Sequence, residues 1–206
     1  MTCTDERPDL KVDPRKFRGA KWLVRTNRAL VHAGFVVAKT APRPAIQAIV
    51  ALLGPECRVG CEVGVLRAHN ARSIMRHVRP QRLYLVDPYA PYSESALYGD
   101  LGVVQREAWC RMSPWAPAIR WVQTDGSARA ASRVPADLDF VYIDGDHRFE
   151  AVQLDLALYG PKVRAGGILG GHDFFDHEGV NRAVVQYCAA AGLQLFTAQN
   201  DWWVMR

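Results

Sequence analysis

The stretch FVYIDGDH, residues 140–147, decides the fold of this chain. Its first four residues form an unbroken apolar and aromatic run, which is typical of a strand buried on both faces in a parallel sheet. The carboxylates of Asp144 and Asp146 and the imidazole of His147 follow directly. They would therefore lie at the C-terminal end of that strand, where open α/β sheets bind their ligands.

Two interpretations fit these polar residues. A metal ion or a proton-transfer site could be built from them. A polar turn before a helix, with Asp146 as its N-cap, explains them equally well. A second polar cluster, residues 170–173 (GGHD), also follows an apolar run. That second cluster favours the functional interpretation, with Asp146 kept as a cap rather than a ligand.

Short apolar runs alternate with helical patterns along most of the chain. We expect strands at 59–63, 83–86, 119–122 and 138–143, a fifth beginning at 166–169, and a final hairpin-like edge formed by 193–197 and 202–205. Helices are expected at 70–78, 101–112, 127–132, 149–159 and 180–191. In the helix at 149–159 we expect apolar contacts from Val152, Leu154, Leu156 and Leu158. This alternation predicts an α/β fold with a doubly wound, mostly parallel sheet.

Residues 1–56 are expected to form a basic N-terminal helical extension, with helices at 21–39 and 45–53, and residues 57–206 to form the sheet domain. Residues 1–45 hold ten Lys or Arg against four acidic residues, so the net charge of +5 is concentrated there. A solvated helical face explains this charge best. A surface for nucleic acid, a membrane or an acidic partner is the alternative, and the lack of interleaved basic and aromatic residues argues against nucleic acid. The two helices could cover the sheet, cap a pocket or form a homodimer contact, and the sequence does not decide between these roles.

The composition favours a cytoplasmic protein. No apolar run approaches the roughly 20 residues of a membrane span, and residues 1–13 lack the apolar segment of a secretory signal. The five cysteines are odd in number and scattered, which is typical of free thiols in a reducing compartment.

The turn after the first expected strand indicates a nucleotide-like ligand. It contains Gly64 and leads into a helix N-terminus, which favours an anionic group. A dinucleotide fingerprint needs three glycines, and only one is present here, so NAD and FAD are poorly supported. Asp87 ends the second expected strand, where an acid can bind ribose hydroxyls. A turn residue before Pro88 is the alternative role for Asp87.

The order of these motifs resembles that of class I S-adenosylmethionine (SAM)-dependent methyltransferases. The motifs that carry the resemblance are Glu62-x-Gly64, Asp87, Asp125-Gly126-Ser127 and Ile143-Asp144-Gly145-Asp146-His147. Residues 143–156, 163–167 and 171–173 are similar in particular to the macrolide-sugar O-methyltransferases and cephalosporin-hydroxylase-like proteins, which are related to catechol O-methyltransferase. The resemblance covers about residues 57–185. It implies a Rossmann-like methyltransferase sheet with SAM as the cofactor.

The resemblance also implies roles for single residues. The cofactor-binding positions it identifies are Glu62, Gly64, Asn70, Asp87, Asp125, Gly126, Ser127 and Asp144. Glu62 and Gly64 would line the methionine end of SAM, Asn70 its carboxylate, Asp87 the ribose, and Ser127 with its neighbours the adenine.

Metal-dependent members of the family bind Mg²⁺ at positions that correspond to Asp144, His172 and Asp173, and their general base corresponds to His147. Two departures are visible. Ala68 replaces a usual glycine, and His172 replaces an acid. Imidazole is a poor ligand for Mg²⁺, so the metal is a softer one, is held by Asp144 and Asp173 with waters, or is not bound.

The resemblance implies an O-methyltransferase acting on a small-molecule hydroxyl, of a sugar or polyphenol-like natural product, with His147 as general base. A divalent cation at Asp144 and Asp173 would lower the pKa of the acceptor hydroxyl. Two other functions stay open. A metal-dependent hydrolase would use the Asp144, His147, His172 and Asp173 cluster, and a non-catalytic binding protein would use the basic arm.

Overall fold

A computed structural model describes residues 41–91 and 98–206. The chain divides into two compact units, Met1–Pro42 and Arg43–Arg206, and the second unit is described below. The helix predicted at 21–39, and any dimer contact it makes, lie outside the described residues. Within the described ranges, no helix combines the length and the apolar character that a bilayer span requires.

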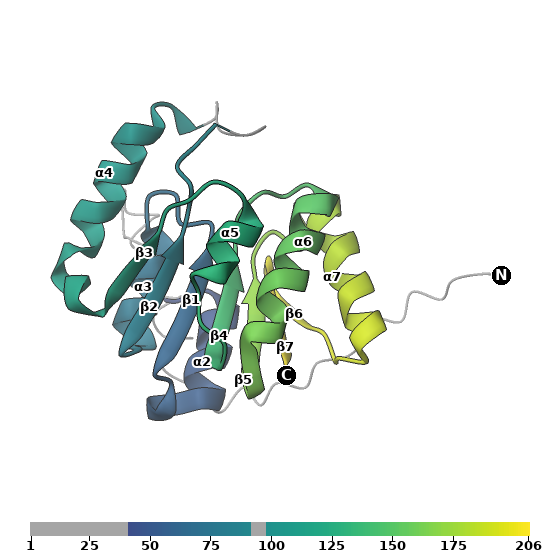
Figure 1. The fold of residues 1–206 in the computed structure, drawn as a ribbon. Coiled ribbons are helices and arrows are strands. Elements are labelled where there is room, and N and C mark those ends of the chain that lie inside the picture. Colours follow the sequence, from purple (N-terminus) through teal and green to yellow (C-terminus); the bar gives the residue numbers. More distant parts are fainter. Residues whose placement is uncertain (1–40, 92–97) are drawn as a thin grey trace, which may run out of the picture. The chain divides into compact units, whose positions relative to one another are not determined.

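A mixed seven-stranded sheet forms the centre of this unit, with the strand order β3-β2-β1-β4-β5-β7-β6 (Figure 1). The strands are β1 (Val59–Val63), β2 (Arg82–Val86), β3 (Ile119–Val122), β4 (Leu138–Ile143), β5 (Val163–Gly171), β6 (Phe196–Ala198) and β7 (Asp201–Met205). β1 to β5 are parallel, whereas β7 is antiparallel to both β5 and β6. The predicted doubly wound, mostly parallel α/β sheet is confirmed. Its order reverses between β1 and β4, which is where such sheets bind ligands.

The last two strands differ from the prediction in one respect. They form the expected antiparallel hairpin, but β7 lies between β5 and β6, so only β6 is at the edge. Trp202 on β7 is consequently fully buried. A strand in this position must bury side chains on both of its faces.

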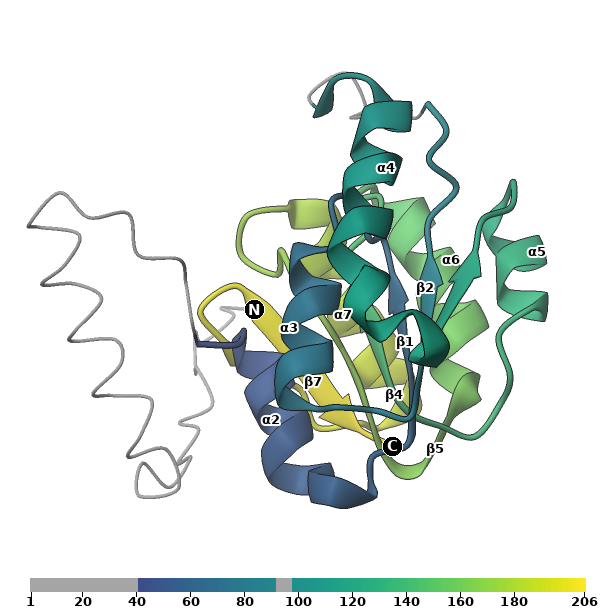
Figure 2. The ribbon, with the colours of Figure 1, turned by 90° about the vertical axis from the view of Figure 1, so that its left-hand side faces the viewer.

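Helices cover both faces of the sheet, and Figure 2 shows the face covered by α2, α3 and α4. One face packs against α2 (Pro44–Leu53), α3 (His69–His77) and α4 (Leu101–Met112), and the other against α5 (Ser127–Ser132), α6 (Phe149–Tyr159) and α7 (Glu178–Ala191). Short 3₁₀ turns occur at η2 (Gly54–Glu56), η4 (Ser113–Ala118) and η5 (Gly160–Lys162).

Strand β4 contributes to the cores on both faces. Phe140 and Tyr142 belong to the core beneath α2 and α3, whereas Val141 and Ile143 belong to the core beneath α6 and α7. Successive side chains of a strand point to opposite faces, so a strand covered on both sides needs an unbroken apolar run. This explains why residues 140–143 were a reliable signal for the fold.

Helix α2 packs on the sheet. It contacts β5 and β7, and Ala45, Ile46 and Ile49 are fully buried. The compact unit therefore begins at Arg43 and takes in the helix that the sequence analysis placed in the extension.

Helix α6 buries the expected Val152 and Leu156, and Leu158 packs partly buried against the same core, but Leu154 does not join them. Val152, Asp155, Leu156 and Tyr159 are buried, whereas Leu154 is 46% exposed. The buried positions follow the spacing i, i+3, i+4, i+7 of one helix face, and Leu154 falls off it. The same helix face carries Asp155, so a carboxylate lies inside the core.

Candidate active site

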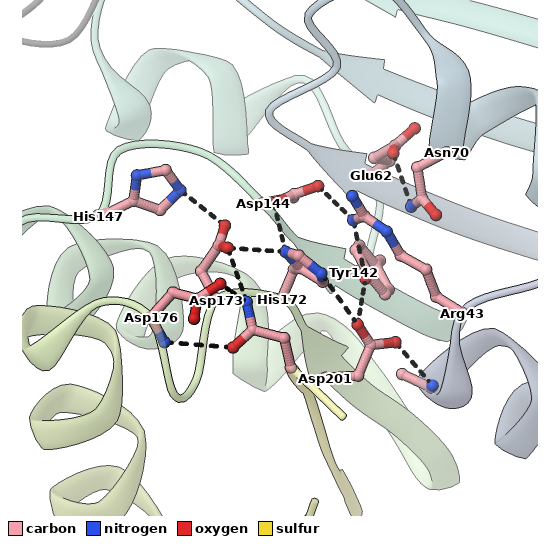
Figure 3. Close-up of polar contacts among 12 residues, drawn as sticks. Arg43, Glu62, Asn70, Tyr142, Asp144, His147, His172, Asp173, Asp176 and Asp201 are labelled. Atoms are coloured by element: carbon pink, nitrogen blue, oxygen red, sulfur yellow. Dashed lines mark hydrogen bonds and ion pairs between the residues drawn. The ribbon is translucent and has the colours of Figure 1, made fainter. Parts of the chain in front are cut away.

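The polar residues of the candidate site lie at or just after the C-terminal ends of β1, β2, β4 and β5. Parallel strands bring these ends to one edge of the sheet. Two groups meet there (Figure 3): Glu62 with Asn70, and Asp144 with His147, His172 and Asp173.

Gly64 brings the turn after β1 against the turn after β4. Its φ is +83°, and a Cβ at this position would lie 2.2 Å from the backbone oxygen of Asp144. Only glycine fits such an approach. Ala68 also has a positive φ, 56°, as the N-cap of α3, which accounts for the glycine usual at this position in related sequences.

Glu62 is buried, with 1% of its surface exposed, and accepts a hydrogen bond from Nδ2 of Asn70 at 2.9 Å. Burial raises the pKa of Glu62 to about 8, although the Asn70 bond lowers it. Among the described residues, Oε2 of Glu62 and Oδ1 of Asn70 have no hydrogen-bond partner. Two buried acceptors without donors are costly, and an ammonium group would satisfy both. These two residues thus fit the amino end of an amino-acid ligand.

Asp87 stabilises the turn that follows β1. Its Oδ2 accepts from the backbone N–H groups of Val65 at 2.9 Å and Leu66 at 2.8 Å, and its Oδ1 accepts from Tyr89 N–H at 2.8 Å. These contacts are those of the turn residue that the sequence analysis gave as the alternative. The ribose-binding role of Asp87 stays a prediction.

The third predicted motif begins α5. Asp125 and Gly126 are exposed, and Ser127 is the first residue of the helix. Burial raises the pKa of Asp155, on α6, to about 7, and the nearby Ser127 side chain opposes this shift. A Cβ at Gly145 would lie 3.8 Å from an oxygen of Asp155. Asp155 is therefore a buried carboxylate close to the turn after β4, and the sequence pattern did not indicate it because apolar residues were expected to fill the buried face of α6.

Asp144 is paired with a residue that the sequence did not single out. Nη1 of Arg43 lies 2.6 Å from Oδ2 of Asp144 and 3.1 Å from the Tyr142 hydroxyl. Burial raises the pKa of Asp144, while the charge of Arg43 opposes this shift. No local motif marks Arg43, which lies 101 positions from Asp144 in the chain.

Asp173 lies between two imidazoles. Its Oδ2 is 2.9 Å from Nε2 of His147, and its Oδ1 is 2.8 Å from Nδ1 of His172. Burial raises the pKa of Asp173, but the bonds to both histidines outweigh it and hold this pKa well below its usual range. Nδ1 of His172 is also 3.9 Å from Oδ1 of Asp144. The four residues predicted for metal and base therefore do come together.

His177, on the loop before α7, stacks on His147 with a ring-centroid distance of 4.0 Å. The described residues contain two overlapping groups with ligand atoms within 4.8 Å of one another: His147, Asp173 and His177, and Asp144, His172 and Asp173.

Asp146 pairs with Arg148 rather than with the residues of the predicted metal site. Its carboxylate accepts bonds from the backbone N–H and the guanidinium of Arg148. The N-cap of α6 is Arg148 itself, so the expectation of Asp146 as N-cap is wrong and Asp146 closes a turn one step earlier. Its exclusion from the metal-binding residues is consistent with these contacts.

The family of the chain follows from comparison with known proteins. A family model described as a methyltransferase domain matches residues 57–174. The chain belongs to this methyltransferase family. The class I SAM-dependent methyltransferase predicted from the sequence is thereby confirmed. No curated protein sequence matched the chain.

Solved structures share the fold. The O-methyltransferase NovP is 20% identical, with a TM-score of 0.60, 79% of this chain covered and 77% of NovP. CalS11, a TDP-rhamnose 3'-O-methyltransferase of calicheamicin biosynthesis, is 14% identical, with a TM-score of 0.53, 78% of this chain covered and 77% of CalS11. MycE, solved with Mg, S-adenosylhomocysteine (SAH) and mycinamycin VI, is 17% identical, with a TM-score of 0.52, 77% of this chain covered and 47% of MycE.

Proposed function

We propose that this methyltransferase transfers the methyl group of SAM to a hydroxyl oxygen of a small molecule, with His147 as the general base. The observation that carries the proposal is the 2.9 Å contact between Nε2 of His147 and Oδ2 of Asp173, at the edge of the sheet where Gly64 and Asp144 meet. A sugar or polyphenol-like acceptor of natural-product type is part of the proposal. Its support is that NovP and CalS11 are O-methyltransferases that share the fold.

The residues present fit SAM at its amino-acid end. The buried acceptors of Glu62 and Asn70 lack donors among the described residues, and the α-ammonium of SAM would supply them. Gly64 lets the adjoining turn pack directly against the backbone of Asp144 and Gly145, which brings the two turns of the site together. When bound, SAM supplies an electrophilic methyl group on a sulfonium and leaves as SAH. Asp87 and Ser127 are proposed to contact its ribose and adenine, with Asp125 and Gly126 beside them.

His147 would remove the proton of the acceptor hydroxyl as its oxygen forms the new bond to carbon. Asp173 accepts a bond from Nε2–H of His147, which fixes the neutral tautomer whose lone pair is on Nδ1. The negative charge of Asp173 would also stabilise the imidazolium that forms. Asp173 is thus a positioning residue that acts through His147.

The residues at the predicted metal position do not fit Mg²⁺. Asp144, the first expected ligand, is paired with the guanidinium of Arg43, and His172 offers nitrogen to an ion that prefers oxygen. Our proposed mechanism therefore contains no step through a metal ion. The metal-dependent hydrolase considered from the sequence is not favoured, because the chain belongs to a methyltransferase family.

We also propose that the protein works in a reducing compartment such as the cytoplasm. Cys57, Cys61, Cys110 and Cys188 are all free thiols, three of them buried. Free thiols persist where glutathione and thioredoxin keep them reduced.

Calorimetry with SAH tests the cofactor, and a screen of phenolic and sugar acceptors with SAM, read by mass spectrometry, tests the transfer. We expect SAH to bind with one site per chain and Glu62→Gln to weaken it. A chain that binds no SAH, or whose Glu62→Gln variant binds it as tightly as wild type, would contradict the proposal. Glu178→Gln is a matched control, because it makes the same substitution at an exposed carboxylate that pairs with Arg182 on α7.

A further inference from the structure

The guanidinium of Arg43 is in the position where a cation would contact Asp144 (Figure 3). Its Nη1 is 2.6 Å from Oδ2 of Asp144, the distance of a charge-assisted hydrogen bond. The same nitrogen donates to the Tyr142 hydroxyl at 3.1 Å, and the guanidinium carbon is 5.9 Å from the Tyr142 ring centroid. Arg43 thus contacts both the last part of β4 and the carboxylate that follows it.

The fold fixes this arginine in place. Arg43 is the N-cap residue of α2, and Pro44 begins the helix. The next backbone N–H, that of Ala45, donates to Oδ2 of Asp201 at 2.8 Å. The Tyr142 hydroxyl donates to the other oxygen of Asp201 at 3.1 Å. Because Ala45, Tyr142 and Asp201 are all buried, the start of α2 is tied to β4 and β7.

An arginine at this place is a permanent positive charge. Burial lowers the pKa of Arg43, but Asp144 and Tyr142 more than offset it, so the net shift is upward. A guanidinium does not lose its proton in proteins. A divalent ion bound to Asp144 would meet this charge at close range and would have to compete with it for Oδ2.

The other oxygens of the expected metal site are also engaged. Oδ1 of Asp173 is 2.8 Å from Nδ1 of His172 and accepts from Nδ2 of Asn200 at 3.1 Å. Oδ2 of Asp173 contacts His147. Mg²⁺ needs near-octahedral oxygen ligands and dehydrates reluctantly, so it cannot easily displace three such partners.

We propose that Arg43 is the resident cation of this site: it neutralises Asp144, excludes hard divalent cations, and makes the methyl transfer independent of a metal. The last part rests on the proposed function, whereas the exclusion of cations does not. The guanidinium has five N–H donors, and the Arg43 side chain is 36% exposed, so it can also contact an oxygen of the bound acceptor. Arg43 would in this way orient the acceptor hydroxyl toward His147.

The test measures Mn²⁺ binding to the full-length protein by electron paramagnetic resonance of the free ion. Wild type should leave Mn²⁺ free. Arg43→Ala leaves Asp144 without its cation and should bind Mn²⁺ at least about tenfold more tightly, about 1.4 kcal/mol. Arg164→Ala is the matched control, because Arg164 pairs with Asp139 at 2.8 Å and is also 36% exposed, yet lies outside the site. This control should behave as wild type.

Two further variants keep the test decisive if the alanine variant unfolds. Arg43→Lys retains the charge and should still exclude Mn²⁺. The double variant Arg43→Ala/Asp144→Asn removes both charges, should fold, and should not bind Mn²⁺. Stoichiometric Mn²⁺ binding by wild type would overturn the proposal. So would an Arg43→Ala protein that folds but binds Mn²⁺ no better than wild type, since Arg43 would then not be what excludes the ion.

An activity assay tests the part of the inference that depends on the proposed function. With an acceptor from the screen, wild-type turnover should be unchanged by EDTA and by added Mg²⁺, whereas Arg43→Ala should lose activity and recover part of it with Mn²⁺, the ion that this variant is expected to bind. Loss of wild-type turnover in EDTA that Mg²⁺ restores would overturn the inference. Failure to bind SAH would instead overturn the proposed function, and the Mn²⁺ measurements would still decide the role of Arg43.

Discussion

Gly64 and Asp144 come so close that no side chain fits between them. A Cβ on Gly64 would lie 2.2 Å from the backbone oxygen of Asp144 and 2.5 Å from Cα of Gly145. This approach joins the turn that would hold the cofactor to the turn that carries His147. The backbone N–H of Asp144 donates to the carbonyl of Val63 at 2.7 Å, which fixes the same relationship.

Gly64→Ala should therefore destabilise the protein and abolish SAH binding. The added methyl group meets backbone rather than a movable side chain, and the φ of +83° disfavours alanine, so we expect a loss of more than about 3 kcal/mol. Urea denaturation measures the stability, and calorimetry measures SAH affinity. Gly192→Ala separates the two causes, because Gly192 has φ +63° but nothing within 4 Å of its added Cβ. That control should cost only about 1–2 kcal/mol and keep SAH binding.

The affinity for SAH should rise with pH between 6 and 8. The pKa of Glu62 in the free protein is about 8 because the side chain is buried, so below this pH the group is mostly protonated. A ligand ammonium needs the carboxylate, and binding must then release a proton, which makes affinity increase by up to about tenfold per pH unit. Calorimetry in buffers of different ionisation enthalpy measures this proton. Glu62→Gln should bind weakly at every pH and release no proton, and a pH-independent wild type would refute the role of Glu62.

The fold could be predicted from the sequence because its signals are local. Residues 140–143 are apolar without interruption because β4 is covered on both faces, and the polar residues after β4 and β5 follow directly in the chain. The residues that pair with the site could not be predicted in this way, because their signals are not local. Arg43 contacts Asp144, and Asp201 contacts Tyr142, only because α2 and β7 pack beside β4. The insertion of β7 between β5 and β6 depends on the same long-range packing, so the pattern of residues 202–205 could not distinguish it from an edge.

Asp155→Asn should stabilise the protein at alkaline pH. Burial raises the pKa of Asp155 in the folded protein to about 7, from an ordinary value of 3.8. Between about pH 4 and pH 7 the folded protein holds a proton that the unfolded chain has lost, so the free energy of unfolding falls as pH rises through this range. Asparagine has no such proton, so the variant should be more stable than wild type by about 1–2 kcal/mol at pH 8 and similar to it near pH 4.

Urea denaturation across this pH range measures the effect, and Asp139→Asn gives a control of opposite sign. Burial raises the pKa of Asp139, but the bonds from Val59 N–H, Arg164 and Arg58 N–H lower it by a larger amount, so the net shift is downward. Its stabilising effect is present above the ordinary pKa and is lost as pH falls, so Asp139→Asn should destabilise at neutral pH. An Asp155→Asn protein less stable than wild type at pH 8 would show that the buried carboxylate is needed in its charged form.

His147→Ala should lower the turnover number by about 10²–10⁴-fold, the contribution usual for a general base, and leave SAH affinity within about twofold of wild type. This separation is expected because His147 contacts Asp173, whereas Glu62 and Asn70 form a distinct pair. His177→Ala is the matched control: it removes the ring stacked on His147 at 4.0 Å but not its contact with Asp173. Asp173→Asn should lower turnover less than His147→Ala, because the base remains but is no longer oriented by a charge. If His147→Ala turns over as fast as the His177→Ala control, proton removal must be assigned to another group.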